Sequence, residues 1–306
     1  MINFGSLITA MVTPFKEDDV SRIDYIAAEK IIDHLVKTGT DSIIIAGTTG
    51  ERPTLEHIEE EEFLAHVLKY VKDKGYDTKI IFGAGSNSTK TSISSVKRAE
   101  ELGADGVLLV CPYYNKPNQK GMINHFSDIA RNTKLPIILY NVKSRSGVSL
   151  SADSVVELAI NNKNIVALKE ASSDLDLITS IRTELDNNAF KIYSGEDTLT
   201  LAMMSIGADG VISVSSHVLG AKMKEMIEAY LSGNNELARQ IHVQIFPVMK
   251  EIFADTNPIG VKAALGGLGI CSARLRSPML ALPLDKQINL KKMIEAVLET
   301  ENELVS

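Results

Sequence analysis

Short apolar runs alternate with helix-spaced segments from the start of the chain to about residue 232. The runs are rich in Ile, Leu and Val, as strands buried on both faces are. The segments between them place apolar residues three or four positions apart, which is typical of amphipathic helices. The pattern therefore predicts eight strands: Leu7–Val12, Asp41–Ala46, Lys79–Ala84, Asp105–Val110, Pro136–Asn141, Ile165–Leu168, Lys191–Ser194 and Gly210–Val214.

Each predicted strand is followed by a predicted helix, and the average unit has roughly 29 residues, which fits the (β/α)8 TIM barrel of about 250 residues. We therefore predict a (β/α)8 barrel over residues 1–232, with a doubly wound open sheet as the alternative. The predicted helices are Asp24–Lys37, Glu56–Val71, Lys90–Leu102, Met122–Thr133, Ser151–Asn161, Leu175–Leu185, Thr198–Ile206 and Ala221–Leu231.

The strand signal stops after Ser232. The remaining pattern predicts helices over Asn235–Phe253, Ile259–Leu268 and Asn289–Glu299. We expect residues 233–306 to form a helical extension whose apolar positions pack on the barrel.

Composition argues against several classes of protein. The formal net charge of the 306 residues is −7 with no basic cluster, which disfavours nucleic acid or an anionic membrane surface as partner. No apolar run reaches the roughly 18–20 residues of a membrane span. Cys111 and Cys271 have no C-x-x-C spacing, which fits a reducing cytoplasm. The six histidines are scattered, so no metal site is expected.

Lys169 directly follows the predicted strand Ile165–Leu168. In parallel α/β folds, ligands and chemistry collect at the carboxyl ends of the strands. An amine at the rim of an apolar interior loses hydration, which lowers its pKa and allows it to form a Schiff base. The residues alone leave a second reading open, in which Lys169 forms a structural ion pair with Glu170 or another carboxylate.

Polar residues also follow other predicted strands. The loop Gly47-Thr48-Thr49-Gly50-Glu51 offers hydroxyls and N–H groups that suit a carboxylate, although an ordinary turn would use the same residues. Tyr113 and Tyr114 follow the fourth strand, where packing and interface roles compete with proton transfer. Tyr140 lies next to the last residue of the fifth strand.

Taken in chain order, these motifs resemble the 4-hydroxy-tetrahydrodipicolinate synthase family, also called dihydrodipicolinate synthase. The likeness runs from about Gly5 to Pro283 and is specific, because each element stands at the end of a predicted strand in the right order. The motifs that carry it are Gly47–Glu51, Pro112–Asn115, Tyr140–Val142, Ser144–Gly147, Lys169–Ala171, Ser194–Asp197 and Gly210–Ser213, with Asn257-Pro258-Ile259 near the C-terminal helices.

That family condenses pyruvate with L-aspartate 4-semialdehyde in lysine biosynthesis. The resemblance implies that Lys169 forms an imine with pyruvate, and that the derived enamine attacks the aldehyde. It also implies proton transfer by Tyr140, linked through Thr48 to Tyr114, which would reach across a tight dimer interface from the neighbouring subunit. Thr49 would hold the carboxylate of pyruvate.

The same resemblance implies that Arg145 binds the carboxylate of the semialdehyde, a task suited to a planar guanidinium. The backbones of Gly195 and Ile212 would line the pocket. No metal or organic cofactor is needed, and a cytoplasmic homotetramer built from two tight dimers is expected.

The chain departs from the family pattern at several positions. Lys143 stands where proline is usual, Arg52 where a small residue is common, Ser173 where glycine is usual and Gly260 where proline is usual. None of these changes removes a catalytic group, but Lys143 and Arg52 bear on the second substrate and on regulation.

Family members inhibited by lysine carry particular polar residues at the dimer cleft. His57, Asn87 and Tyr113 match that pattern, whereas Glu60 and Lys90 replace a histidine and an acid. We therefore expect weak or absent lysine inhibition.

Two other functions compete with the synthase. A related pyruvate aldolase, such as an N-acetylneuraminate or keto-sugar-acid lyase, would use the same lysine and tyrosine, but usually lacks the arginine at the position of Arg145. A non-catalytic barrel that only binds ligands is disfavoured, because Lys169, Tyr140, Thr48 and Tyr114 are all present.

Overall fold

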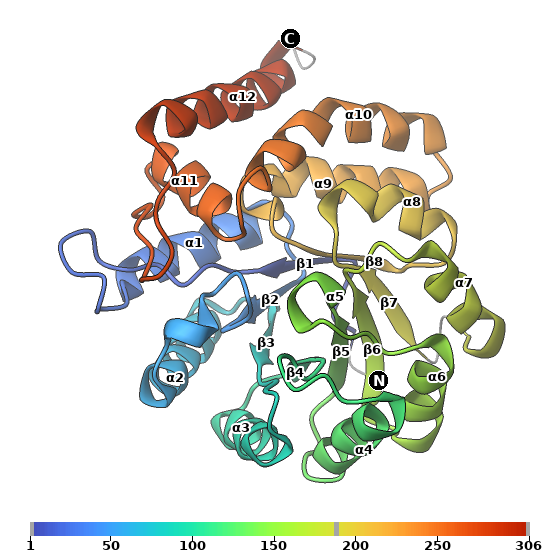
Figure 1. Ribbon diagram of the computed structural model, residues 1–306. Helices are drawn as coiled ribbons and strands as arrows, with labels where there is room; N and C mark the ends of the chain where they lie inside the picture. Colours follow the sequence, from blue (N-terminus) through green and yellow to red (C-terminus); the bar gives the residue numbers. More distant parts are fainter. Residues whose placement is uncertain (1–2, 187–189, 304–306) are drawn as a thin grey trace.

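Eight parallel strands close into a barrel in the computed structural model, which describes residues 3–186 and 190–303 (Figure 1). Each strand pairs with the next along the chain, and β8 pairs back with β1, with Leu7 opposite Val211. This closure confirms the predicted TIM barrel and rules out the open sheet. The strands are β1 (Leu7–Ala10), β2 (Ser42–Ile45), β3 (Lys79–Gly83), β4 (Gly106–Val110), β5 (Ile137–Asn141), β6 (Ile165–Glu170), β7 (Lys191–Ser194) and β8 (Gly210–Ser213).

A ring of helices surrounds the strands (Figure 1). Five of them begin at a polar residue whose side chain accepts a hydrogen bond from the backbone N–H three residues later, namely Asp24, Ser88, Asn118, Ser151 and Asp174. The main helices of the ring are α1 (Tyr25–Lys37), α2 (His57–Lys74), α3 (Thr89–Leu102), α4 (Gln119–Ala130), α6 (Ala152–Asn161), α7 (Leu175–Glu184), α8 (Thr200–Ser205) and α9 (Ser216–Leu231).

Three short elements lie in loops after strands: α5 (Lys143–Ser146) after β5, η1 (Arg52–Thr54) after β2 and η2 (Asp197–Leu199) after β7. Neither α5 nor η1 was predicted, because an element of three or four residues is too short to display a helical period. The predicted helix Thr198–Ile206 is instead divided into η2 and α8.

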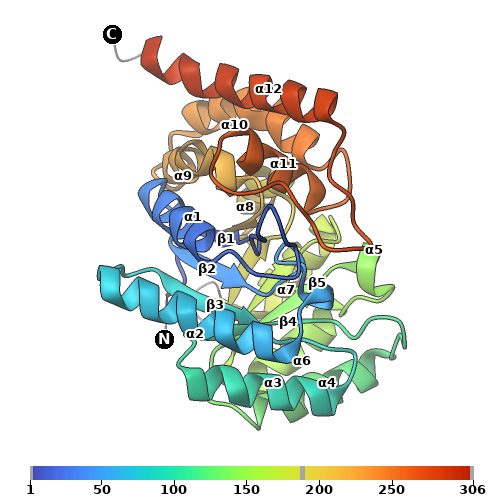
Figure 2. The same cartoon turned by 90° about the vertical axis from the view of Figure 1, so that its left-hand side faces the viewer.

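Three further helices follow the barrel: α10 (Asn235–Ile252), α11 (Ile259–Gly267) and α12 (Leu284–Glu303). They lie together on one side of it, with α10 against α9 and α12 outermost (Figures 1 and 2). This arrangement confirms the predicted helical extension, although its last helix begins at Leu284 instead of Asn289. Residues 1–2, 187–189 and 304–306, which the two predicted segments include, lie outside the described residues.

The core has two apolar layers, because successive side chains of a strand point to opposite faces. One layer fills the space between strands and helices. The other fills the barrel interior and includes Ile8, Ile44, Leu108 and Ile138, with Tyr140 near the carboxyl end of β5. Among the described residues, no helix is long and apolar enough to cross a membrane.

Candidate active site

A cavity of about 570 Å³ lies at the carboxyl ends of the strands. Its wall comes from the ends of β5 and β6, from the loops after β2 and β7, from α5, and from residues 253–257 between α10 and α11. Six of the residues singled out from the sequence meet there: Thr48, Thr49, Tyr140, Arg145, Lys169 and Gly195.

Lys169 lies opposite Tyr140 in the pairing of β5 with β6, and its Nζ is 4.6 Å from the centroid of the tyrosine ring. Its side chain is buried. Burial lowers the pKa of its amine from 10.5 to about 8, against the opposing effect of the carboxylates of Asp197 and Glu196. A far larger fraction of this amine is therefore unprotonated near neutral pH than for an ordinary lysine, which makes it a competent nucleophile.

The carboxylate of Glu170 is not paired with the amine of Lys169. Its Oε2 accepts a hydrogen bond from Asn141 Nδ2 at 3.1 Å, and its Oε1 accepts from Ser172. Burial raises the pKa of this carboxyl group. Neighbouring residues of a strand face opposite sides, so the side chain of Glu170 points away from that of Lys169. It is held there by the neutral side chains of Asn141 and Ser172. The Lys169–Glu170 ion pair that the sequence left open therefore does not form.

Tyr140 is buried beside the amine. Burial raises the pKa of its phenol to about 12, while the charge of Arg145 and a hydrogen bond with Thr48 act in the opposite direction. The phenol therefore keeps its proton at neutral pH. The side chain is in position to give that proton to a group formed at Lys169 and to recover it from the same place.

Thr49 and Arg145 are both held by Asn257. The Nδ2 atom of Asn257 donates to Thr49 Oγ1 at 3.0 Å, and its carbonyl oxygen accepts from Arg145 Nη2 at 3.2 Å. Thr49 is 2% exposed, whereas Arg145 is exposed on α5. The cavity thus has a buried hydroxyl on one wall and a guanidinium at its rim, and Asn257 was assigned no role from the sequence.

The end of β7 approaches the end of β6 at Gly195, whose N–H donates to the carbonyl oxygen of Glu170 at 2.6 Å. A Cβ atom at this position would stand 2.5 Å from that of Ala171, so only glycine fits. Gly195 lines the cavity as expected. Ile212 is fully buried in the barrel interior, and the lining at β8 comes instead from Val214.

Two acids after β7, which the sequence reasoning placed in a motif but gave no role, belong to the site. Glu196 lines the cavity, and burial raises the pKa of its carboxyl group. Asp197 is buried, and its Oδ2 accepts from the N–H groups of Val214 and Ser215 at 3.2 and 2.7 Å. Asp197 thereby fixes the turn after β8 against the end of β7.

Tyr114 is the one predicted catalytic residue that the chain does not bring to the cavity. Its side chain is 90% exposed, and its backbone adopts a left-handed conformation with φ of 71°. The role implied for it involves a neighbouring subunit, so that role stays a prediction.

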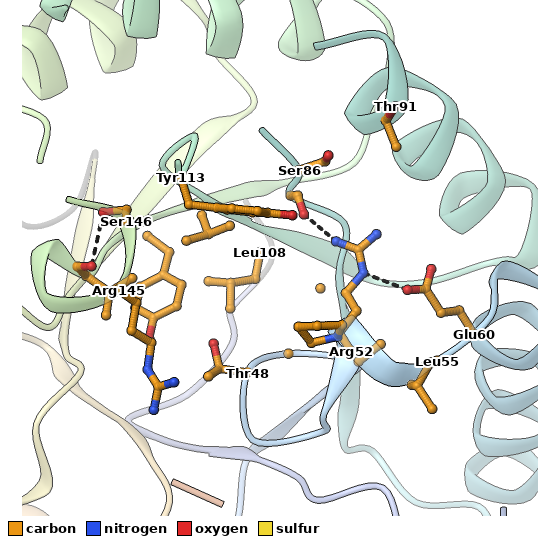
Figure 3. Close-up of a pocket in the computed structure, with 18 of the residues that line it drawn as sticks. Thr48, Arg52, Leu55, Glu60, Ser86, Thr91, Leu108, Tyr113, Arg145 and Ser146 are labelled. Carbon is orange, nitrogen blue, oxygen red and sulfur yellow. Dashed lines mark hydrogen bonds and ion pairs between the residues drawn. The ribbon is translucent and has the colours of Figure 1, made fainter. Parts of the chain in front are cut away.

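A second cavity, of about 440 Å³, adjoins the first and shares Thr48, Tyr140 and Arg145 with it. Figure 3 shows Arg145 at one end and Arg52 with Glu60 at the other, with Thr48 between them. Arg52 Nε lies 2.8 Å from Glu60 Oε1, and the guanidinium also donates to the carbonyl oxygen of Gly85. Arg52, where the family usually has a small residue, therefore forms part of the wall of the second cavity.

Lys143 lines neither cavity. Its side chain is exposed on α5, two residues before Arg145.

The loop that carries Thr48 and Thr49 is anchored from its far end. Glu51 has a left-handed backbone with φ of 54°, and its carboxylate is paired with Lys262 of α11. The N–H of Arg276 donates to Glu51 Oε2 at 3.0 Å. The Arg276 guanidinium binds Glu59 through two hydrogen bonds of 2.7 and 2.6 Å. Sequence reasoning gave no sign of this network.

Within residues 3–186 and 190–303, no group of three or more His, Cys, Asp or Glu side chains is placed to hold a metal ion. The side chains that line the cavity include an amine, a phenol, two hydroxyls, a carboxyl group and a guanidinium, from Lys169, Tyr140, Thr48, Thr49, Glu196 and Arg145.

The fold and the cavity together define a (β/α)8-barrel protein with a buried amine beside a tyrosine at the carboxyl ends of its strands. The chain belongs to the dihydrodipicolinate synthetase family, whose model matches residues 3–297. The family predicted from the motifs is thus confirmed.

Individual relatives agree with this family over nearly their whole length. The 4-hydroxy-tetrahydrodipicolinate synthase of Bacillus subtilis is 44% identical over 293 residues, which is 96% of this chain and 99% of the relative. The dihydrodipicolinate synthase of Cyanidioschyzon merolae, solved with lysine bound, has a TM-score of 0.92 and 42% identity over 96% of this chain and 98% of that one. The Aquifex aeolicus enzyme has a TM-score of 0.91 and 40% identity over the same shares.

Proposed function

We propose that this chain is a 4-hydroxy-tetrahydrodipicolinate synthase, a lyase that condenses pyruvate with L-aspartate 4-semialdehyde in the diaminopimelate route to lysine. The observation that supports this most is the buried amine of Lys169 beside Tyr140, in the cavity at the carboxyl ends of the strands. The relatives that carry this name match nearly the whole chain.

The reaction begins when Nζ of Lys169 attacks the keto carbon of pyruvate. Tyr140 protonates the hydroxyl group of the resulting carbinolamine, which leaves as water, and an imine remains. The positive imine nitrogen makes the methyl group acidic. The Tyr140 phenolate takes up a methyl proton to give an enamine, whose carbon attacks the aldehyde of the second substrate while Tyr140 returns the proton to the aldehyde oxygen. The amino group of the semialdehyde then attacks the imine carbon, which closes the ring of the product and frees the amine of Lys169. Thr48 links Tyr140 to Tyr114 of a neighbouring subunit for proton exchange.

The two substrates each carry a carboxylate, and the cavity has a separate group for each. Thr49 holds the carboxylate of pyruvate through its hydroxyl and N–H, with the backbone of Gly195 completing that end. Arg145, at the rim, holds the carboxylate of the semialdehyde, because a guanidinium forms two parallel hydrogen bonds with such a group.

A pyruvate aldolase with a different aldehyde partner is the second candidate. It would share Lys169 and Tyr140, but Arg145 at the cavity rim favours a carboxylate on the second substrate. A binding protein without catalysis would have no use for an amine whose pKa is lowered to about 8.

We further propose a homotetramer of two tight dimers. Tyr114 is 90% exposed, so its proposed role requires the second subunit of a tight dimer. The association of two such dimers rests on the resemblance to the family. The free thiols of Cys111 and Cys271 fit the cytoplasm. The amine of Lys169 supplies the reactive group, so the reaction needs no metal or organic cofactor. Residues 1–232 form the catalytic barrel and 233–306 the helical extension.

The deciding experiment measures pyruvate consumption by the purified protein with aspartate semialdehyde, with Lys169→Ala as control. Turnover that the variant loses supports the synthase. A borohydride-trapped pyruvate adduct without turnover would instead support an aldolase with another aldehyde. An adduct that survives Lys169→Ala would refute the Schiff-base mechanism, and sedimentation of the same preparation as a monomer would contradict the role of Tyr114.

A further inference from the structure

Asn257 reaches the candidate active site from the C-terminal part of the chain. It lies between α10 and α11, in the segment 253–257 that forms one wall of the cavity. Its Nδ2 atom donates to Thr49 Oγ1, a contact between residues 208 positions apart. Its Oδ1 atom is buried and has no hydrogen-bond partner within the described part of the chain.

The hydrogen bond between these two side chains has a direction. A threonine hydroxyl has one proton to donate and two lone pairs to accept with. Because the amide nitrogen of Asn257 can only donate, Oγ1 of Thr49 accepts in this contact and its own proton is left for another partner. Both residues line the cavity in which the substrates are expected.

We infer that Asn257 is a positioning residue for pyruvate: its amide fixes the Thr49 hydroxyl as a donor toward the substrate carboxylate. This inference rests on the proposed function, which puts pyruvate at Thr49. Asn257 acts through Thr49 and does not take part in the bond-forming steps.

The backbone of the same residue provides a built-in comparison. The carbonyl oxygen of Asn257, not its side chain, holds the guanidinium of Arg145, the proposed site for the semialdehyde. A substitution that keeps the backbone in place should therefore weaken pyruvate binding and leave semialdehyde binding nearly unchanged. A residue that merely supports the wall would affect both substrates alike.

Two substitutions separate the direction of the hydrogen bond from its mere presence. In Asn257→Ala the hydroxyl rotates freely, and the KM for pyruvate should rise about 3–10-fold. In Asn257→Asp the new carboxylate accepts the Thr49 proton and repels the substrate carboxylate, so the KM for pyruvate should rise more than about 30-fold. The KM for aspartate semialdehyde should stay within about twofold of wild type in Asn257→Ala, which adds no charge to the cavity. Exposed Asn161 of α6 supplies the matched control, Asn161→Asp.

A double substitution tests whether Asn257 acts through Thr49. Thr49→Val removes the hydroxyl, so adding Asn257→Ala to it should raise the KM for pyruvate no further. Independent effects that multiply would overturn the inference. Equal KM values for pyruvate in Asn257→Asp and Asn257→Ala would also overturn it, as would equal rises in the KM values for both substrates in Asn257→Ala.

Reductive trapping of the pyruvate imine, titrated with pyruvate alone, keeps this test separate from the choice of aldehyde. If wild type traps pyruvate but does not use aspartate semialdehyde, the proposed synthase reaction is wrong, yet the half-saturating pyruvate concentration should still rise in the order wild type, Asn257→Ala, Asn257→Asp. Wild type that traps no pyruvate at any concentration would overturn both the inference and the proposed function.

Discussion

Lys262 and Glu51 form an ion pair that is closed to water, since their side chains are 0% and 1% exposed. Nζ of Lys262 also donates to the carbonyl oxygen of Arg274 at 3.0 Å and lies 4.0 Å from the centroid of the Phe15 ring. Burial lowers the pKa of this amine, against the opposing charge of Glu51. The informative perturbation is Lys262→Met, which keeps most of the side-chain volume and removes only the charge and its hydrogen bonds.

The variant should lose about 3–5 kcal/mol of unfolding free energy, because it leaves a carboxylate buried without its cation. That is a large share of the roughly 5–15 kcal/mol by which most domains are stable. For a protein of this size the corresponding fall in Tm is about 5–8 °C. Thermal unfolding followed by circular dichroism at a single scan rate, with both proteins at equal concentration, measures it.

Lys291→Met is the matched control. Lys291 forms an exposed pair with Glu295 at 3.7 Å, and losing it should change the stability by less than about 1 kcal/mol. Adding Glu51→Gln to Lys262→Met should restore part of the loss, because no charge then remains buried. The reasoning is refuted if Lys262→Met melts with the control, or if the double variant is no more stable than Lys262→Met alone.

Two further predictions concern the cavities. Trapping of pyruvate with cyanoborohydride requires the neutral amine of Lys169. Because the pKa of this amine is about 8, the initial rate of trapping should rise roughly 25-fold from pH 6.5 to 8.5 and then level off. An amine of ordinary pKa would give about 100-fold and a rate still climbing at pH 9, which would contradict the lowered value. Lysine should inhibit turnover weakly, because the carboxylate of Glu60 is already paired with Arg52 and is not free for an added ammonium group; half-inhibition at micromolar lysine would contradict this.

The barrel and the centre of the site could be predicted because both follow from local pattern. Each strand is a run of apolar residues buried on both sides, and a (β/α)8 fold brings the residues after these runs to one end. Lys169, Tyr140 and Thr48 all stand at or just after the end of a strand, so their meeting in one cavity needed no knowledge of side-chain packing.

The contacts between distant residues that hold the site could not be predicted from local sequence pattern. Lys262 and Glu51 are more than two hundred positions apart, and no local period marks either as the partner of the other. Asn257 stood within a recognised motif, but its partner depends on how the chain between α10 and α11 crosses the barrel. Apolar periodicity reports which face of an element is buried, and not which polar groups meet across elements.

The structure shows what two of the departures from the family pattern do to the backbone and its packing. Ser173 has a left-handed backbone with φ of 61°, a conformation that glycine adopts freely and that costs other residues about 1–2 kcal/mol. Gly260 lies so close to the end of α10 that a Cβ atom would stand 2.1 Å from the carbonyl oxygen of Ile252. Proline at that position would therefore require α10 and α11 to move apart.

The five-residue loop Gly47–Glu51 after β2 is held at two points by residues from the C-terminal part of the chain. Asn257 holds the hydroxyl of Thr49, and Lys262 with the N–H of Arg276 holds the carboxylate of Glu51. The last strand of the barrel ends at Ser213, so all eight strands come from the part of the chain that precedes Asn257, Lys262 and Arg276. A barrel without the extension would keep Lys169 and Tyr140 in register but would leave a left-handed turn and a charged side chain without partners beside them. The proposed division at residue 232 therefore separates two patterns of sequence, while residues from both parts line the candidate site.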